Sequence, residues 1–164
     1  MRTDPNALAP QGPGLQLVVF SLDGQRYALP VTTAERVLLM VAVSPLPRAP
    51  AIALGVINLH GQVTPVLDIR CRFGLPVREY GIHGHLLVAR TSRRTLALPV
   101  DEVLGVQTVA VEAVTPPDAV LPGIGHVAGI AALPDGLLFI QDLDAFLSLD
   151  EQEGLTRALT EMEG

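Results

Sequence analysis

The feature of this sequence that most restricts its fold is an internal repeat. The tetrapeptide Ala-Leu-Pro-Val at 28–31 recurs unchanged at 97–100. A second block repeats at a slightly longer spacing, as a loop insertion between the blocks would produce, and its matched pairs are Gly55 and Gly129, Val66 and Ile140, Asp68 and Asp142, and Ile69 and Leu143. Chance similarity between apolar segments is the alternative, and the shared order of the blocks argues against it. The repeat predicts two copies of one small unit, at about 15–81 and 83–147.

Both copies carry the pattern of short β-strands joined by tight turns. Asp23-Gly24 suits a type I′ hairpin turn, because both central residues of that turn need positive φ. The hairpins that we expect are 15–22 with 25–31, 54–59 with 63–69, 86–91 with 95–100, and 129–133 with 137–143. The segment 32–40 is compatible with a short helical turn or with a strand. Many short strands separated by turn residues indicate an all-β barrel or sandwich.

The two ends of the chain differ from this pattern. Residues 1–14 are rich in proline and glycine, which predicts a disordered N-terminal tail before the folded domain at 15–147. Within 148–164, Ser148 and Glu151 have the spacing of a capping box, and Leu155, Leu159 and Met162 fall on one helical face. We therefore expect a short C-terminal helix packed on the barrel, in preference to an exposed helix that binds a partner.

Composition and charge exclude several classes of protein. The net charge of −6 argues against nucleic acid, which requires a basic surface. The basic cluster Arg90, Arg93 and Arg94 is interpreted as a solvated hairpin end. A single cysteine, Cys71, fits a reducing compartment. The N-terminus lacks the apolar stretch of a signal peptide, and the apolar run 37–43 is too short to span a bilayer. These features predict a cytoplasmic protein without direct membrane insertion.

The sequence lacks the usual catalytic arrangements. It contains neither a Gly-x-Ser-x-Gly elbow nor a P-loop. Cys71 lies between two arginines but has no adjoining histidine or second cysteine. His83 and His85 form the best metal-binding candidate, yet no third ligand occurs at a recognisable spacing. We expect a binding module without enzyme activity, metal or cofactor, and a small metal-binding barrel or enzyme is the alternative.

One segment resembles a known family signature. Residues 54–69, LGVINLHGQVTPVLDI, are similar to the signature of the CheW family of chemotaxis coupling proteins, which usually reads G-V-I-N-L-R-G, two hydrophobic residues, and P-V-hydrophobic-D-L. The segments 18–22, 27–30 and 98–103 resemble the family's opening strands and its V-D-x-V segment. The match extends over about 15–147. The resemblance implies two intertwined five-stranded β-barrels with a hydrophobic interior between them.

The resemblance also implies a function. Members of the family are non-catalytic adaptors that pair with the regulatory domain of a CheA-type histidine kinase. They also bind the cytoplasmic tip of methyl-accepting chemoreceptors, and so join arrays at the inner face of the membrane. The alternative with the same fold is a scaffold for a non-flagellar chemosensory pathway that controls motility, biofilm formation or development.

The receptor-binding positions of the family fall on specific residues of this chain. By motif position they are Ala34, Arg36, Asn58, His60, Gly61, Leu96 and Val103. Ordinary core packing is the alternative for the apolar members, and a structural role in the turn is the alternative for Asn58 and Gly61.

Two of these positions depart from the family pattern. His60 stands where the family normally has arginine, and Arg36 stands where it commonly has glutamate. Both changes alter the charge at the rim of the receptor-binding groove that the resemblance implies. Such a change affects the choice of partner more than overall affinity. We therefore hypothesise that this adaptor serves a divergent or dedicated set of receptors.

Overall fold

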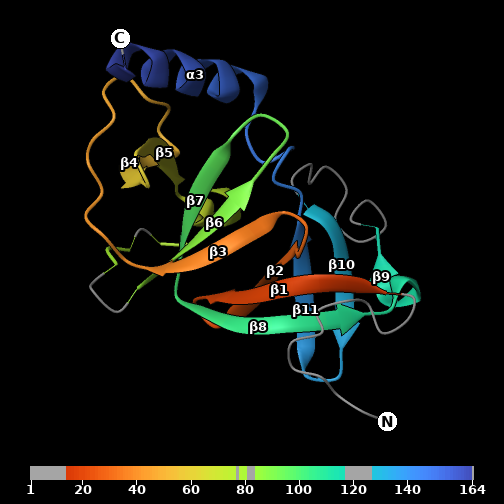
Figure 1. Cartoon of the computed structure of the whole chain (residues 1–164). Helices are drawn as coiled ribbons and strands as arrows, with labels where there is room; N and C mark the ends of the chain where they lie inside the picture. Colours follow the sequence, from red (N-terminus) through yellow and green to blue (C-terminus); the bar gives the residue numbers. More distant parts are fainter. Residues whose placement is uncertain (1–13, 77, 81–83, 117–126, 164) are drawn as a thin grey trace.

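The computed structural model describes residues 14–76, 78–80, 84–116 and 127–163, and its elements form two sheets and two α-helices (Figure 1). The expected disordered tail, apart from Gly14, and His83 lie outside these residues. The first sheet has the strand order β8-β1-β2-β11-β10-β9, and its strands are β1 (Leu15–Leu22), β2 (Gln25–Pro30), β8 (Glu102–Val109), β9 (Val114–Thr115), β10 (Val127–Leu133) and β11 (Gly136–Gln141). The second has the order β3-β6-β7-β5-β4, and its strands are β3 (Ala34–Leu39), β4 (Ala53–Leu59), β5 (Gln62–Leu67), β6 (His85–Arg90) and β7 (Thr95–Val100).

In each sheet, two consecutive strands of the chain lie at the two ends of the strand order. In the first sheet β8 and β9 follow each other in sequence, joined by the short 3₁₀ helix η1 (Val111–Ala113), but lie at opposite ends of the strand order. In the second sheet the chain leaves β3 and Ser44 then pairs with Val56 of β4. The predicted fold of two β-barrels is confirmed. The first sheet has one strand more than the expected five, because the two-residue β9 pairs with β10.

The barrels are intertwined because the repeats exchange hairpins. The hairpin β1–β2 from the first half joins β8–β11, whereas the hairpin β6–β7 from the second half joins β3–β5. Each exchanged hairpin is held by a parallel pairing at equivalent repeat positions: Ala28 faces Ile140, and Ala97 faces Val66. The β-bulges also correspond, because the register shifts between Ala53 and Gly55 in β4 and between Val127 and Gly129 in β10.

Three apolar clusters fill the molecule. The first barrel encloses Leu17, Val19, Ala28, Val109, Ala131, Leu138 and Ile140. The second encloses Ile57, Val66, Leu86, Val88 and Ala97. The largest cluster contains residues of both sheets and of the C-terminal helix, and it includes Phe20, Tyr27, Leu87, Leu98, Phe146, Leu155 and Ala158. The predicted hydrophobic interior between the barrels is therefore present, and burial of this surface is the main driving force for their association.

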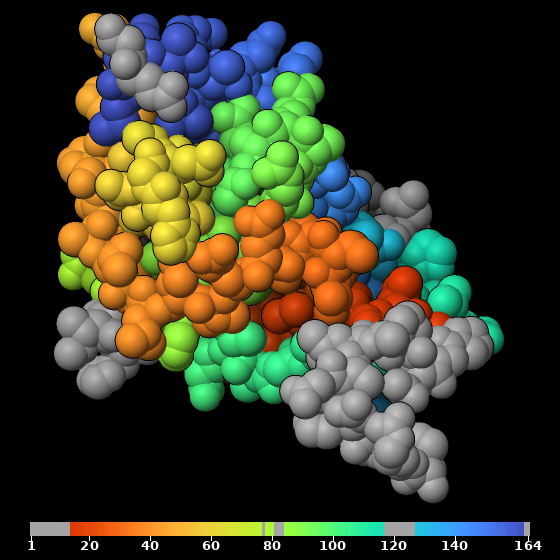
Figure 2. Space-filling model, viewed as in Figure 1, coloured from red at the N-terminus to blue at the C-terminus, as the bar shows by residue number. Residues whose placement is uncertain are grey.

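Helix α3 (Leu149–Glu163) packs on the second barrel, and Figure 2 shows it directly against the segments of β4, β5 and the β6–β7 hairpin. The capping box is formed: the Ser148 N–H donates to Glu151 Oε1 over 2.9 Å, and the Glu151 N–H donates to Ser148 Oγ over 3.1 Å. Leu155 is buried and Leu159 half-buried, as expected. Met162 was expected on the same buried face, but it is 42% exposed because the last turn extends beyond the core.

A short helix, α1 (Ile69–Phe73), replaces the end of the strand expected at 63–69. Asp68 caps its N-terminus by accepting the N–H of Arg70, and Gly74 ends it in the left-handed conformation with φ of 67°. The alternating apolar pattern that continues through Ile69 favoured a strand, and the two caps override it.

Two hydrogen-bonded arrangements hold the tips of the exchanged hairpins, and we call each a clasp. In the first clasp, Asp68 orients Arg70, which pairs through Nη2 with Asp23 Oδ1 in the β1–β2 turn over 2.8 Å. In the second clasp, Asp142 Oδ1 accepts the N–H of Asp144 over 3.1 Å. Asp144 Oδ1 in turn accepts the N–H of Ser92 in the β6–β7 turn over 2.8 Å and the hydroxyl of Ser92 over 2.6 Å. Each barrel thus forms polar contacts with the tip of a hairpin that belongs to the other barrel.

The first clasp is built around a buried arginine. Arg70 is 1% exposed, and it also pairs with Asp101 over 3.0 Å and donates through Nε to the hydroxyl of Tyr80 over 2.7 Å. The hydrogen bond to Asp23 is the main reason why the pKa of Arg70 lies above its usual range. Because Asp101 lies between β7 of the second sheet and β8 of the first, the cluster sits where the chain crosses between barrels.

We predict that the two repeat-related glycines are both required, for different physical reasons. A Cβ on Gly55 would lie 2.2 Å from the Ser44 carbonyl oxygen, at a φ of 153°, whereas a Cβ on Gly129 would lie 2.5 Å from Val114 Cγ1. Gly55→Ala should lower the free energy of unfolding by about 3 kcal/mol, and Gly129→Ala by about 1–3 kcal/mol, as overpacking does. Both are measured by urea denaturation.

The matched control is Val114→Ala. Added to Gly129→Ala it should restore most of the lost stability, because it removes the clashing side chain, whereas added to Gly55→Ala it should restore nothing. Equal rescue of both variants would contradict this account of the two glycines.

We also predict an acid-dependent loss of stability from the first clasp. The hydrogen bond from Arg70 holds the pKa of Asp23 below its ordinary value of 3.8. A carboxyl group with a lowered folded-state pKa stabilises the protein above its unfolded pKa, and that contribution is lost as the pH falls below 3.8 through the folded-state pKa. Asp23→Asn should therefore lower the thermal unfolding midpoint at pH 7 and reduce its further decline below pH 3.8. Parallel decline in both proteins would show that Asp23 does not contribute.

Candidate partner-binding surface

The predicted receptor-binding residues fall into two groups. Ala34, Leu96 and Val103 belong to the first group, at the large cluster between the barrels. Ala34 and Leu96 lie in one row, because each pairs with Ala89 on β6. Leu96 is only 1% exposed, so the structure places it in the core and not on a surface that a partner can reach. Ala34 and Val103 are half-buried at the edge of that cluster.

The second group surrounds the β4–β5 turn. His60 and Gly61 have φ of 52° and 86°, which is the type I′ geometry that connects antiparallel strands tightly. Asn58 Oδ1 accepts the N–H of Gly61 over 2.7 Å and so fixes the turn. The structural interpretation of Asn58 and Gly61 accounts for both residues, and their effect is to present the exposed side chain of His60.

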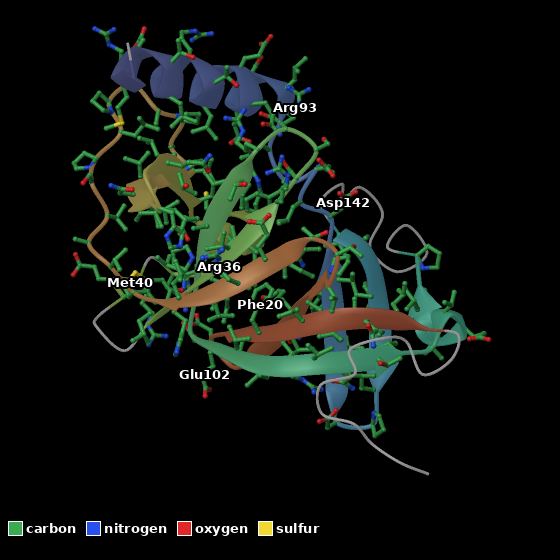
Figure 3. All side chains as sticks on the ribbon, in the orientation of Figure 1. Phe20, Arg36, Met40, Arg93, Glu102 and Asp142 are labelled. Carbon is green, nitrogen blue, oxygen red and sulfur yellow. The ribbon has the colours of Figure 1, made fainter. Side chains whose placement is uncertain are left out.

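Arg36 and His60 are brought together across the opening of the second barrel. Arg36 Nη1 lies 2.7 Å from His60 Nε2, and both side chains are exposed. Figure 3 shows Arg36 on β3, the strand at the opposite end of the sheet order from β4. Their contact depends on closure of the barrel, since the Ser44–Val56 pairing brings the two ends of the sheet together.

A hollow of about 490 Å³ adjoins the same turn at Gly61. Its lining includes backbone and side chains of 61–65 together with Arg90, Arg94, Thr95 and Leu159. The prediction of a solvated hairpin end is correct for the exposed Arg90 and Arg93 but wrong for Arg94. Arg94 donates through Nη2 to Thr156 Oγ1 over 2.7 Å, and burial lowers its pKa, with Arg93 adding to the effect. It therefore connects the hairpin to α3.

An apolar hollow of about 540 Å³ was not predicted from the sequence. It is lined by Met40, Val41, Ala42, Val43, Leu54, Arg78, Glu79, Tyr80 and Pro99. Val41 and Leu54 are large apolar residues with 48% and 46% of their surface exposed. An apolar patch of this kind, bordered by charged side chains, is typical of protein–protein contact sites. The only sequence signal for it is the apolar run at 37–43.

The described residues also bear on the metal alternative and on membrane insertion. Among them, no group of three or more histidine, cysteine or acidic side chains has the geometry of a metal site. His85 lies on β6, and its Nδ1 is buried without a hydrogen-bond partner in the described part of the chain. Within the same residues, no helix combines the length and the apolar character that a membrane span requires.

Comparison with known sequences agrees with these features. The family model described as CheW-like domain matches residues 16–151. The chemotaxis protein CheW of Rhizobium meliloti is 27% identical over 142 residues, which cover 85% of this chain and 92% of that protein. The protein FrzA of Myxococcus xanthus is 30% identical over 112 residues, which cover 68% of this chain and 70% of that protein.

Comparison with solved structures gives the same result. The scaffolding protein TtCheW from Thermoanaerobacter tengcongensis is similar with a TM-score of 0.76 and 27% sequence identity. The match covers 84% of this chain and 95% of that structure, so it includes both barrels. The paired barrels, the turn at His60 and the extent of these matches lead to one conclusion: this chain belongs to the CheW-like domain family.

Proposed function

We propose that this chain is a non-catalytic adaptor of chemosensory signalling, which couples a chemoreceptor to a CheA-type histidine kinase from the cytoplasmic face of a receptor array. Membership of the CheW-like domain family supports an adaptor role. The single observation that carries the proposal is the presence of two different surfaces at opposite ends of β4. An adaptor needs two such surfaces, because it must hold two partners at once.

The surface around Arg36 and His60 is proposed to bind the receptor tip. A helical partner is recognised by an apolar strip and by polar groups that fix its register. Half-buried Ala34 and Val103 supply apolar edges at the cluster between the barrels, and the exposed Arg36–His60 pair supplies the polar groups. Leu96 lies in the core in the same row, two strands away from Ala34.

The apolar hollow around Val41 and Leu54 is proposed to bind the kinase regulatory domain. Association of two barrel domains requires burial of apolar surface, and exposed Val41 and Leu54 offer it at the entrance of the hollow. Leu54 and His60 are six strand positions apart, which places the two surfaces about 20 Å from each other. The two proposed surfaces are therefore separate.

We predict that Val41→Glu will separate the two binding activities. The charge at the apolar hollow should weaken binding to the kinase regulatory domain at least ten-fold, on the order of 1.4 kcal/mol, and leave receptor binding unchanged. Val111→Glu is the matched control, because Val111 is 55% exposed on η1, away from both surfaces. Calorimetric titration with each partner makes the measurement, and equal loss in the two variants would contradict the assignment of the hollow.

We predict that the charge pattern at the turn sets the choice of receptor. Arg36→Glu together with His60→Arg recreates the pair of residues that the CheW resemblance implies. The double variant should bind tips of standard chemoreceptors several-fold more tightly than the native chain, since a guanidinium gives bidentate contacts that an imidazole does not. If the native chain binds those tips equally well and the double variant changes nothing, the dedicated-receptor hypothesis is wrong.

A further test addresses the adaptor role itself. The purified chain is added to a CheA-type kinase and a chemoreceptor from the same organism, and phosphotransfer is followed. The activity of the kinase under receptor control should depend on this chain. Absence of binding to any CheA-type regulatory domain would contradict the proposed function.

A further inference from the structure

The contact between Arg36 and His60 determines the charge of the histidine. A guanidinium group has donors only, so the 2.7 Å contact from Arg36 Nη1 requires His60 Nε2 to accept. His60 is therefore neutral in this arrangement, with its proton on Nδ1. Protonation of Nε2 would remove the acceptor and place two positive charges against each other.

The surroundings of this pair are positively charged, although the chain has a net charge of −6. Within the described residues, no carboxylate forms an ion pair with Arg36 or His60. On β4 and β5 the neighbours Asn58 and Gln62 are uncharged. The charged residues on the other adjoining elements are Glu35, exposed on β3, and Arg90 and Arg94 in the hollow that adjoins the turn.

We propose that the Arg36–His60 pair binds a carboxylate from an acidic segment of the protein partner, and that His60 takes up a proton when it binds. This inference rests on the proposed function, since it names the chemistry of the partner at that surface. The carboxylate accepts hydrogen bonds from the guanidinium, and its negative charge favours the charged imidazolium. The proton comes from solvent and goes to Nε2, which changes from an acceptor for Arg36 into a donor to the carboxylate.

The second cationic group indicates a segment of protein instead of a single small anion. Arg90 and Arg94 line a hollow of about 490 Å³. The lining of this hollow also includes Gly61, which follows His60 in the turn. A chain with several carboxylates can contact both the pair and this hollow, because His60 is adjacent to Gly61, which lines the hollow. An acidic segment is therefore complementary to the whole surface.

The proposal is tested with the full chain and poly-L-glutamate as the probe. Calorimetric titration at pH 8, 7 and 6 in low salt should show binding that becomes about five-fold tighter from pH 8 to pH 6, because histidine normally changes charge in this range. Titration in buffers of different ionisation heat should show proton uptake, and the NMR signal of the His60 ring should change to that of an imidazolium on binding.

Variants separate this effect from the general change in net charge. His60→Gln should lose the tightening and the proton uptake, His60→Arg should bind at all three pH values without proton uptake, and Arg36→Gln should bind weakly throughout. Arg93→Gln, an exposed arginine on the neighbouring hairpin, is the control and should retain the pH dependence. Unchanged pH dependence in His60→Gln would overturn the proposal, as would proton uptake with inorganic phosphate but not with poly-L-glutamate.

The same variants distinguish failure of this inference from failure of the proposed function. If receptor and kinase bind the native chain and His60→Gln with the same pH dependence, the adaptor role stands and the carboxylate site is wrong. If poly-L-glutamate binds with proton uptake but neither receptor nor kinase binds, the carboxylate site stands and the adaptor role is wrong.

Discussion

The structure depends on how each barrel holds the tip of a hairpin that belongs to the other barrel. Asp68 and Asp142, matched by the repeat, both accept the N–H of the residue two positions later. That residue is Arg70 in one clasp and Asp144 in the other, and its side chain holds the opposite hairpin turn. Without these contacts an exchanged hairpin would be held only by its strand pairings and by the apolar cluster between the barrels. The same backbone hydrogen bond thus positions a positively charged side chain in one half and a negatively charged side chain in the other.

The difference between the clasps follows from their burial. Arg70 is almost fully buried, and an unpaired charge at that depth would cost several kcal/mol, so it is surrounded by Asp23, Asp101 and Tyr80. The contacts of the Asp144 clasp are exposed, and there two short hydrogen bonds to Ser92 suffice. The buried cluster also contains Asp101, the residue at which the chain passes from one sheet to the other. It therefore orders the crossover as well as the hairpin tip.

Local chemistry explains which parts of this fold the sequence predicts. The hairpin turns at Asp23 and His60 are predicted because positive φ is a local requirement that a few residue types meet. Intertwining of the barrels was expected only from the family resemblance and not from local patterns, since the pairings of Ala28 with Ile140 and of Ala97 with Val66 depend on residues far apart in the chain. The helix at Ile69–Phe73 was missed because its apolar residues continue a strand pattern, and its caps are the stronger signal. Among the candidate site residues, Leu96 was predicted at the surface because a motif position does not report burial.

The site itself is a consequence of barrel closure. Arg36 is on β3 and His60 is in the β4–β5 turn, and nothing local to either residue predicts that they touch. They meet because Ser44 pairs with Val56, and that pairing leaves room only for glycine at position 55. Gly55, the first glycine of the family signature, thus shapes the proposed partner surface although it is not part of that surface. Because closure also positions Val41 and Leu54 at the other end of β4, one packing constraint sets the separation of both proposed surfaces. The proposed adaptor role requires two partners to be held at a fixed distance, and the pairing of Ser44 with Val56 would set that distance.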